Sequence, residues 1–406
     1  MAKSATELIR KNHSFRMVWI GQVLSQAGLR MYQIAILWWI LGQVAPDRGG
    51  QSSAMFLLLA ASPSILFLKP IGQLIDRSSS KKIMAAASLL AAFFMATVSL
   101  CLYGSLASLS MIFLLGFMVA FCQACIDPTL TKSIPELVDS DDIETAVAFE
   151  ASTQSLANFG GAMCGAMLID RLGIFGVTLL TSIGYVVSSV AVASATFLPI
   201  LGDQKDPLPD ENSPGVWKYL EKEMSIKLIL MIFAMVNFFS NPVFVVLPVY
   251  TRNILGASAA VLGQLEASLW IGLLIGAFSQ RFVKGKAAIS VLGSLCLFAL
   301  GFCLSLPALA VSPLVYALSL FGAGMAVGIN NVTFISYFQR VIHDKYRGRF
   351  FALMQGLVSV TFPVSFFMFG FLIDAIGPRK VILIQGIGIL AVSIFMISRK
   401  GLIEKS

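Results

Sequence analysis

Four polar side chains interrupt an apolar stretch at residues 19–39, namely Gln22, Gln26, Arg30 and Gln33. The stretch is long enough to cross a bilayer as one α-helix, which needs about 20 residues. At about 100° per residue the four side chains fall within about 80° of one another and form one narrow stripe. Hydrocarbon does not solvate a guanidinium, so Arg30 must face protein or water. The stripe predicts either a water-filled cavity, in which Gln26, Arg30 and Gln33 contact a bound molecule, or a buried structural ion pair.

Three carboxylates lie inside other apolar stretches, at Asp127, Glu150 and Glu266. Acidic residues are rare in hydrocarbon and commonly mark proton relays, so each is a candidate for binding and releasing a proton. Structural roles are the alternative. Glu266 is similar in depth to Arg30, which allows an ion pair, and Asp127 precedes Pro128, where it would cap a disturbed helix end.

Four asparagines form a second polar group. Asn237 and Asn241 are one helical turn apart, and Asn330 and Asn331 are adjacent in another apolar stretch. Contact with a small molecule is one interpretation of these amides, and hydrogen bonding between helices is the other.

Enzymatic and cofactor chemistry have no support in the sequence. The two histidines lie outside the apolar stretches, and no GxxxxGK[ST] loop for a nucleotide occurs. Cys122 and Cys125 form a CxxC without a second CxxC or a nearby histidine, so we interpret them as helix-packing residues. We therefore expect no catalytic residue, no cofactor and no metal site.

The composition predicts a membrane protein built of α-helices. Hydrophobic residues make up 57% of the 406 residues, charged residues only 12%, and the mean hydropathy is +0.84. A soluble domain carries about 25% charged residues. The apolar stretches are about 20 residues long, unlike the alternating segments of about 10 residues in a β-barrel. The net charge of +8 comes from Lys and Arg in short loops, which indicates membrane topology and not nucleic-acid binding.

Apolar stretches bounded by charges, glycine or proline predict twelve transmembrane helices. One long hydrophilic segment, 202–225, divides them six and six. We therefore expect an N-terminal bundle (1–201), a cytoplasmic linker and a C-terminal bundle (226–406). The predicted spans are residues 15–42, 52–75, 83–103, 107–131, 145–169, 174–198, 227–250, 259–281, 287–306, 311–337, 350–373 and 380–398.

The distribution of Lys and Arg predicts the orientation in the membrane. With the N-terminus inside, the outer loops hold only Arg48, Arg171, Arg252, Arg379 and Lys380. This bias places both termini in the cytoplasm. The polar N-terminal segment lacks the apolar core of a signal peptide, so we expect the first span to remain in the protein.

The two halves of the sequence repeat. At one constant offset, Gly72 aligns with Gly276, Arg77 with Arg281, and Asp127 with Asn331. The same offset aligns LID at 168–170 with LID at 372–374, and Gln33 with Asn237. Parallel repeats of this kind are common among secondary transporters.

Residues 72–82, GQLIDRSSSKK, resemble the signature loop between the second and third helices of the major facilitator superfamily. That pattern is Gly-x-Leu-x-Asp-Arg-x-Gly-Arg-Arg/Lys, and the matching positions are Gly72, Leu74, Asp76, Arg77 and Lys81. Ser79 stands where the second glycine is expected. The resemblance implies that Asp76, Arg77, Lys81 and Lys82 latch the bundles in one conformation. Topology-setting loop charges are the alternative.

Residues 12–28, 341–353 and 370–380 resemble the macrolide-efflux and siderophore-exporter branch of that superfamily. Members of the branch often carry an Asp where this chain has Leu29, followed by Arg30. Exporters also tend to show GPxxGG in the fifth span, and here the proline is missing at 160–165. The small residues of that segment would still allow close helix packing.

The resemblance implies an alternating-access transporter, and the branch implies export. We expect an all-α membrane protein with two pseudo-symmetric six-helix bundles, working as a monomer in a bacterial cytoplasmic membrane. It would export a small organic molecule of the drug or macrolide type, driven by protons. A siderophore exporter is the alternative, because an anionic siderophore would use Arg30. A lipid or lysolipid flippase and a transporter-like receptor are further alternatives.

Overall fold

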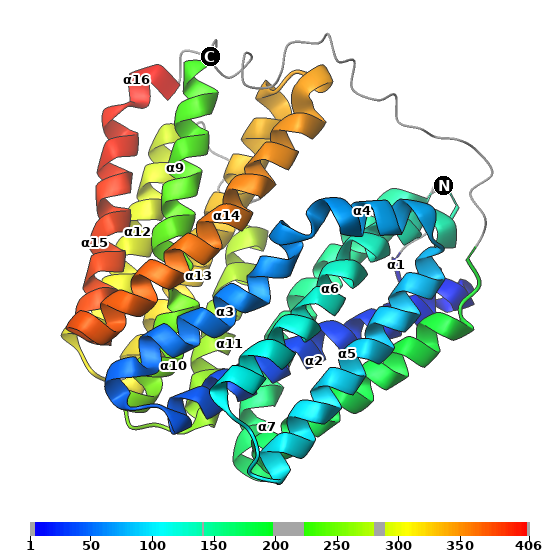
Figure 1. The fold of residues 1–406 in the computed structure, drawn as a ribbon. Helices are drawn as coiled ribbons and strands as arrows, with labels where there is room; N and C mark the ends of the chain where they lie inside the picture. Colours follow the sequence, from blue (N-terminus) through cyan, green and yellow to red (C-terminus); the bar gives the residue numbers. More distant parts are fainter. Residues whose placement is uncertain (1–4, 140–141, 198–222, 280–288, 404–406) are drawn as a thin grey trace. The chain divides into compact units, whose positions relative to one another are not determined.

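The computed structural model describes residues 5–139, 142–197, 223–279 and 289–403 (Figure 1). These residues are predominantly α-helical and include no strand, which confirms the predicted fold class. Their contacts divide the chain into two compact units. Unit 1 comprises Met1–Val44, Met55–Gly202 and Ser258–Gly263, and unit 2 comprises Ala45–Ala54, Asp203–Ala257 and Gln264–Ser406. Each unit therefore includes a short segment from the other half of the sequence. The predicted linker lies almost entirely outside the described residues.

The first half of the chain supplies the helices of unit 1, and it gives a 3₁₀ turn and the tip of one helix to unit 2. The elements are α1 (Ala5–Lys11), α2 (His13–Gln43), the 3₁₀ turn η1 (Pro46–Arg48), α3 (Gly49–Leu66), α4 (Leu68–Arg77), α5 (Ser80–Tyr103), α6 (Leu109–Leu137) and α7 (Ile143–Ser194). In unit 1, α2 packs along α7, and α5 packs against both α6 and α7.

The second half supplies the helices of unit 2. They are α9 (Met224–Ser240), α10 (Val243–Asn253), α11 (Ala259–Ser279), α12 (Ile289–Leu309), α13 (Pro313–Val341), α14 (Asp344–Ile376), α15 (Pro378–Ser398) and α16 (Lys400–Ile403). The first residues of α11 belong to unit 1. In unit 2, α12 packs against α13 and α15, and α9 packs against α14 and α15.

Local sequence signals account for where the main helices begin and break. Asn12 caps α2, because its Oδ1 accepts a hydrogen bond from the Phe15 amide at 2.9 Å. The predicted spans 145–169 and 174–198 run together as α7, which is interrupted only at Gly173. Gly173 has φ 69°, a left-handed conformation that glycine adopts without strain. The predicted span 52–75 is a bent pair, α3 and α4, with a bend of 55°.

Glycines bring neighbouring helices into backbone contact within each unit. In unit 1, a Cβ added to Gly161 would lie 2.5 Å from the Ala27 carbonyl oxygen on α2. The predicted close packing of segment 160–165 is therefore confirmed. In unit 2, Gly272 of α11 lies directly against the Phe321 backbone, and Gly324 of α13 lies against the Leu269 backbone. Small residues one turn apart are a common means of packing membrane helices closely.

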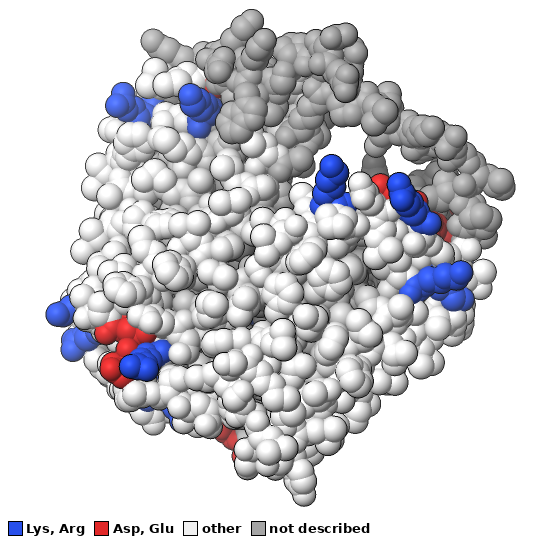
Figure 2. All heavy atoms as spheres, viewed as in Figure 1, with Lys and Arg blue, Asp and Glu red and all other residues white. Residues whose placement is uncertain are grey.

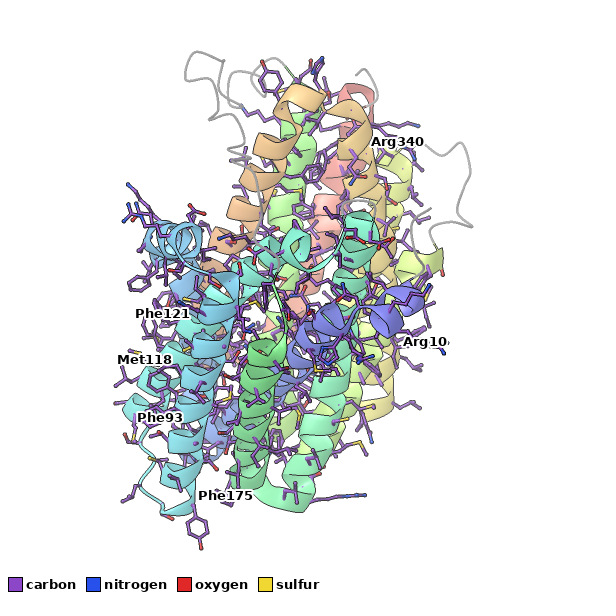
Figure 3. All side chains as sticks on the ribbon, turned by 90° about the vertical axis from the view of Figure 1, so that its right-hand side faces the viewer. Arg10, Phe93, Met118, Phe121, Phe175 and Arg340 are labelled. Atoms are coloured by element: carbon purple, nitrogen blue, oxygen red, sulfur yellow. The ribbon has the colours of Figure 1, made fainter. Side chains whose placement is uncertain are left out.

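The helix surfaces are those of a protein that sits in lipid. Nine helices of the described chain are long and apolar enough to span a membrane, or ten if the bent pair counts as one span. The exact number of twelve spans remains a prediction. Charged side chains on the visible face lie toward the helix ends, and the wide middle is uncharged (Figure 2). Phe93 of α5, 63% exposed, extends away from the helices (Figure 3).

Candidate functional site

The polar stripe of α2 meets two carboxylates inside unit 1. Gln26 Nε2 donates a hydrogen bond to Asp127 Oδ1 at 2.9 Å. One turn earlier, Gln22 Nε2 donates to Glu150 Oε1 at 3.2 Å. Gln22 and Gln26 are both buried, each 6% exposed. The stripe therefore binds carboxylates of α6 and α7 through neutral amides, and this arrangement holds an acid in place without forming an ion pair.

Asp127 is held by a second amide as well. Gln123, one turn earlier on α6, donates from Nε2 to Asp127 Oδ1 at 2.6 Å. The hydroxyl of Tyr185 on α7 donates to Gln123 Oε1 at 2.7 Å, and Tyr185 is fully buried. These contacts join α2, α6 and α7 in one network of Tyr185, Gln123, Asp127 and Gln26. Sequence analysis missed Gln123 and Tyr185. The spacing of Gln123 four residues before Asp127 was the available signal.

Asp127 lies in the wall of a cavity of about 190 Å³ in unit 1, which we call the carboxylate cavity. Gln33 of the α2 stripe also lines it, and Arg30 Nη1 donates to Gln33 Oε1 at 3.1 Å. The hydroxyl of Tyr32, another lining residue, is buried without a hydrogen-bond partner among the described residues. The lining residues are Leu29, Tyr32, Gln33, Phe56, Ala60, Ser64, Gly116, Val119, Ala120, Gln123, Ala124 and Asp127.

A second cavity, of about 260 Å³, lies in unit 2. All four predicted asparagines line it, and we call it the asparagine cavity. Asn237 donates from Nδ2 to the Phe233 carbonyl at 2.8 Å, and Asn241 Nδ2 lies 3.4 Å from Asn237 Oδ1. The lining residues are Phe233, Val236, Asn237, Ser240, Asn241, Val243, Phe244, Leu269, Trp270, Leu273, Leu300, Leu304, Ala323, Val327, Asn330, Asn331 and Phe362.

Three buried polar atoms of the asparagine cavity have no hydrogen-bond partner within the described chain. They are Ser240 Oγ, Trp270 Nε1 and Asn330 Oδ1. A buried polar group without a partner destabilises a protein by ~1–3 kcal/mol, so native structures rarely collect several in one place. Sequence analysis selected Asn330 here but missed Ser240.

The remaining predicted acid, Glu266, lies on α11 in unit 2 and is 3% exposed. It does not line the asparagine cavity. Glu150 is only partly buried and does not line the carboxylate cavity. Of the three predicted proton-coupling residues, Asp127 lines the carboxylate cavity, whereas Glu150 and Glu266 line neither this cavity nor the asparagine cavity.

The predicted gating loop joins α4 to α5 in unit 1. Lys81 Nζ donates to the Ala195 carbonyl at 2.8 Å, whereas Asp76, Arg77 and Lys82 are exposed. A Cβ added to Gly72 would meet no other atom within 4 Å. The turn at Ser78 and Ser79 has φ of −124° and −66°, so serine fits where the family pattern has glycine. Residues 276–286, which the repeat aligns with this loop, lie mostly outside the described residues.

No group of three His, Cys, Asp or Glu side chains that could hold a metal ion occurs in the described parts of the chain. Cys122 and Cys125 are both buried free cysteines on α6. Asp127 accepts hydrogen bonds from Gln26 and Gln123 in a cavity wall that is otherwise mostly apolar.

Comparison with known proteins identifies the family. The model of the Major Facilitator Superfamily matches residues 18–364. "Macrolide efflux protein A" of Streptococcus pyogenes is 22% identical over 386 residues, covering 94% of each chain. The protein of the same name from Enterococcus faecalis is 23% identical over 322 residues, covering 77% of this chain and 99% of that one.

The fold is also that of solved transporters. A bacterial homologue of the human lysosomal transporter Spinster, in an inward-facing and unoccupied conformation, superposes with a TM-score of 0.75 at 12% identity. The match covers 97% of this chain and 98% of that one. At this identity the likeness concerns the fold alone. With the family match over most of its length, the chain belongs to the Major Facilitator Superfamily and is a multi-pass α-helical membrane transporter, not an enzyme.

Proposed function

We propose that the protein is a proton-coupled exporter of small organic molecules in a bacterial cytoplasmic membrane, with both termini in the cytoplasm. It works as a monomer by alternating access. The names of the macrolide-efflux relatives and their bacterial sources support export. The bias of Lys and Arg toward one side of the predicted spans supports the orientation.

The observation that carries the proton coupling is the position of Asp127. Its carboxylate lies on the wall of the carboxylate cavity and accepts hydrogen bonds from Gln26 and Gln123. Neutral amides orient the carboxylate without supplying a compensating positive charge. A carboxylate of this kind in a membrane protein is a natural site for taking up and releasing a proton.

Substrate binding is assigned to residues of both cavities. Gln33 contributes to the carboxylate cavity, and the four asparagines contribute to the asparagine cavity. Siderophore export is the second candidate. It is favoured by Arg30, whose guanidinium donates to Gln33 on the carboxylate-cavity wall and would attract an anion.

The test is flux in proteoliposomes that contain the purified protein and an imposed pH gradient. The probes are erythromycin and an anionic catecholate chelator, and pyranine reports proton movement. Asp127→Asn should abolish proton-driven accumulation of the transported probe while leaving its downhill exchange measurable. Accumulation of the chelator alone would favour the siderophore reading.

Matched carboxylate variants sharpen this experiment. Glu136→Gln changes an acid on the same helix, bound to Ser80 and outside the cavity, and should keep coupled transport. Glu150→Gln and Glu266→Gln test the other two predicted proton-coupling residues. Proton movement that persists in Asp127→Asn but is lost in Glu266→Gln would move the coupling site to α11.

A further inference from the structure

The wall of the asparagine cavity combines an aromatic surface with isolated polar atoms. Trp270 of α11 stacks on Phe244 of α10, with ring centroids 6.4 Å apart and an interplanar angle of 29°. Phe233 and Phe362 add further aromatic surface to the lining. A planar apolar group bound here would have rings to pack against, a geometry that aromatic side chains favour.

The unpartnered atoms define what else a ligand must carry. The indole N–H of Trp270 requires an acceptor, and the Asn330 side-chain oxygen requires a donor. Asn330 is only 4% exposed, so water on the protein surface does not satisfy it. The hydroxyl of Ser240 can serve in either role. The cavity therefore offers a donor and an acceptor together.

No charged residue stands among the described lining residues of this cavity. A charged group bound there would lose its hydration without gaining a counter-charge, which is strongly unfavourable. The volume of about 260 Å³ exceeds the roughly 150 Å³ that holds a benzene ring. The site therefore suits a neutral group larger than one ring.

We propose that the asparagine cavity binds a neutral, planar, amphipathic group through stacking on Trp270 and hydrogen bonds to Trp270 Nε1 and Asn330 Oδ1. This assignment rests on the proposed function, because it names the chemical class that the transporter recognises in unit 2. It predicts that the transported molecule presents an uncharged aromatic or conjugated portion with a hydroxyl or amide to this site.

The test is calorimetric titration of the purified protein in detergent with three probes of equal ring size. These are 2-naphthol, naphthalene-2-carboxylate and 2-naphthylmethylammonium. The wild-type protein should bind 2-naphthol at least about tenfold more tightly than either ion. Equal affinity for an ion, or no binding of 2-naphthol, would overturn the proposal.

Two variants assign the binding to the named atoms. Trp270→Phe keeps a ring but removes the N–H, and should weaken 2-naphthol about 5- to 10-fold, the usual effect of one hydrogen bond. Asn330→Asp keeps the shape but adds a charge, and should reverse the preference toward the ammonium probe. Unchanged affinities for all three probes in both variants would contradict the proposal.

Two control variants test whether the binding is specific to the asparagine cavity. Trp19→Phe removes another indole N–H, the donor to Thr153 Oγ1 at 2.9 Å in unit 1, and should leave 2-naphthol affinity unchanged. Glu136→Gln, outside both cavities, should also bind 2-naphthol normally. Binding in detergent needs no proton gradient, so a failure of proton coupling and a failure of this ligand class are seen in different measurements.

A second inference comes from two aspartates that the repeat aligns. Asp374, near the end of α14, accepts hydrogen bonds from the Gly50 amide at 2.7 Å and the Gln51 amide at 2.8 Å, inside unit 2. Asp170 of α7 accepts one from the Ala260 amide at 3.2 Å, inside unit 1. Each aspartate therefore caps the first turn of a helix, α3 or α11, where a negative charge is favourable.

The small residue one turn before each aspartate adds a close contact. A Cβ added to Gly370 would lie 2.8 Å from the Gly50 carbonyl oxygen. The corresponding residue of the first repeat, Ala166, lies directly against Gly263. Both places have a small residue followed four positions later by an aspartate. We call the pairs Gly370–Asp374 and Ala166–Asp170 the clasps.

We infer that each clasp fixes the first turn of the helix that it holds. Asp374 does so for α3 inside unit 2, and Asp170 does so for α11 inside unit 1. Loss of either aspartate frees the backbone amides that it binds.

Hydrogen exchange of the full-length protein in detergent tests this inference. Asp374→Ala should speed exchange at residues 50–51, and Asp170→Ala should speed exchange at residue 260. Each variant is the control for the other, because the two clasps lie in different units. Unchanged exchange at the capped residues in both variants would refute the inference, and so would equal changes at both helix tips in each variant.

Discussion

The Asp127 network of the carboxylate cavity, which does not include the unpartnered Tyr32 hydroxyl, differs from the unpartnered atoms of the asparagine cavity in how its polar groups are satisfied. In the carboxylate cavity, Asp127 and Gln123 bind one another and are held by Gln26 and Tyr185. In the asparagine cavity, Trp270 and Asn330 present buried atoms that no described residue engages. A self-satisfied network is suited to gaining and losing a proton, because little else must rearrange. Unengaged groups are suited to an organic ligand that completes their hydrogen bonds.

The difference predicts opposite effects on stability. Removing a member of a satisfied network leaves its partners buried and unpaired, which costs more than the bond itself contributes. Removing a polar group that has no hydrogen-bond partner leaves no other group unpaired. Stability measured without any substrate therefore distinguishes the two cavities, independently of transport.

The largest effect is expected for Gln123→Leu, which removes the donor to Asp127 and the acceptor for the Tyr185 hydroxyl. The free energy of unfolding should fall by roughly 2–5 kcal/mol, because two buried groups lose a partner. Thermal unfolding in detergent checks this through the Tm. Tyr185→Phe removes only the hydroxyl and should cost less. If both variants melt alike, the network does not hold Asp127 in the way described.

An intermediate effect is expected for Gln26→Leu. Asp127 keeps its hydrogen bond from Gln123, so the loss should be roughly 1–2 kcal/mol. The matched change Gln22→Leu breaks the longer contact with the partly buried Glu150 and should lower the Tm less. A larger loss from Gln22→Leu would mean that the main anchor of the stripe is Glu150.

The smallest effect is expected for Ser240→Ala in the asparagine cavity. Its hydroxyl has no partner within the described chain, so the free energy of unfolding should stay within about 0.5 kcal/mol or rise. Ser182→Ala, which removes a buried hydroxyl that donates to the Ala92 carbonyl at 2.8 Å, should be destabilising. An equal decrease in the free energy of unfolding in the two serine variants would contradict the view that Ser240 lacks a partner.

Sequence periodicity was sufficient to predict the helical architecture and the polar stripe. It selected Gln26, Gln33 and Asp127, and the structure brings all three to or beside one cavity. It also selected four asparagines that prove to share a second cavity. In both cases the signal was strong because polar residues are conspicuous inside apolar stretches.

The partners of those residues were not predictable in the same way. Tyr185 lies 62 positions from Gln123, and a tyrosine in an apolar stretch gives no sign of where its hydroxyl points. The same holds for the indole N–H of Trp270. The clasp aspartates were visible only as the repeated LID segments, because the helix tips that they cap come from distant parts of the sequence.

The break at Gly173 has a practical consequence for topology mapping. Because α7 continues on both sides of one left-handed residue, the connection there has no slack. An epitope tag inserted at that point would have to force two packed helices apart, and expression should suffer. The turn between α5 and α6, residues 104–108, already contains non-helical backbone and is the better place for a reporter.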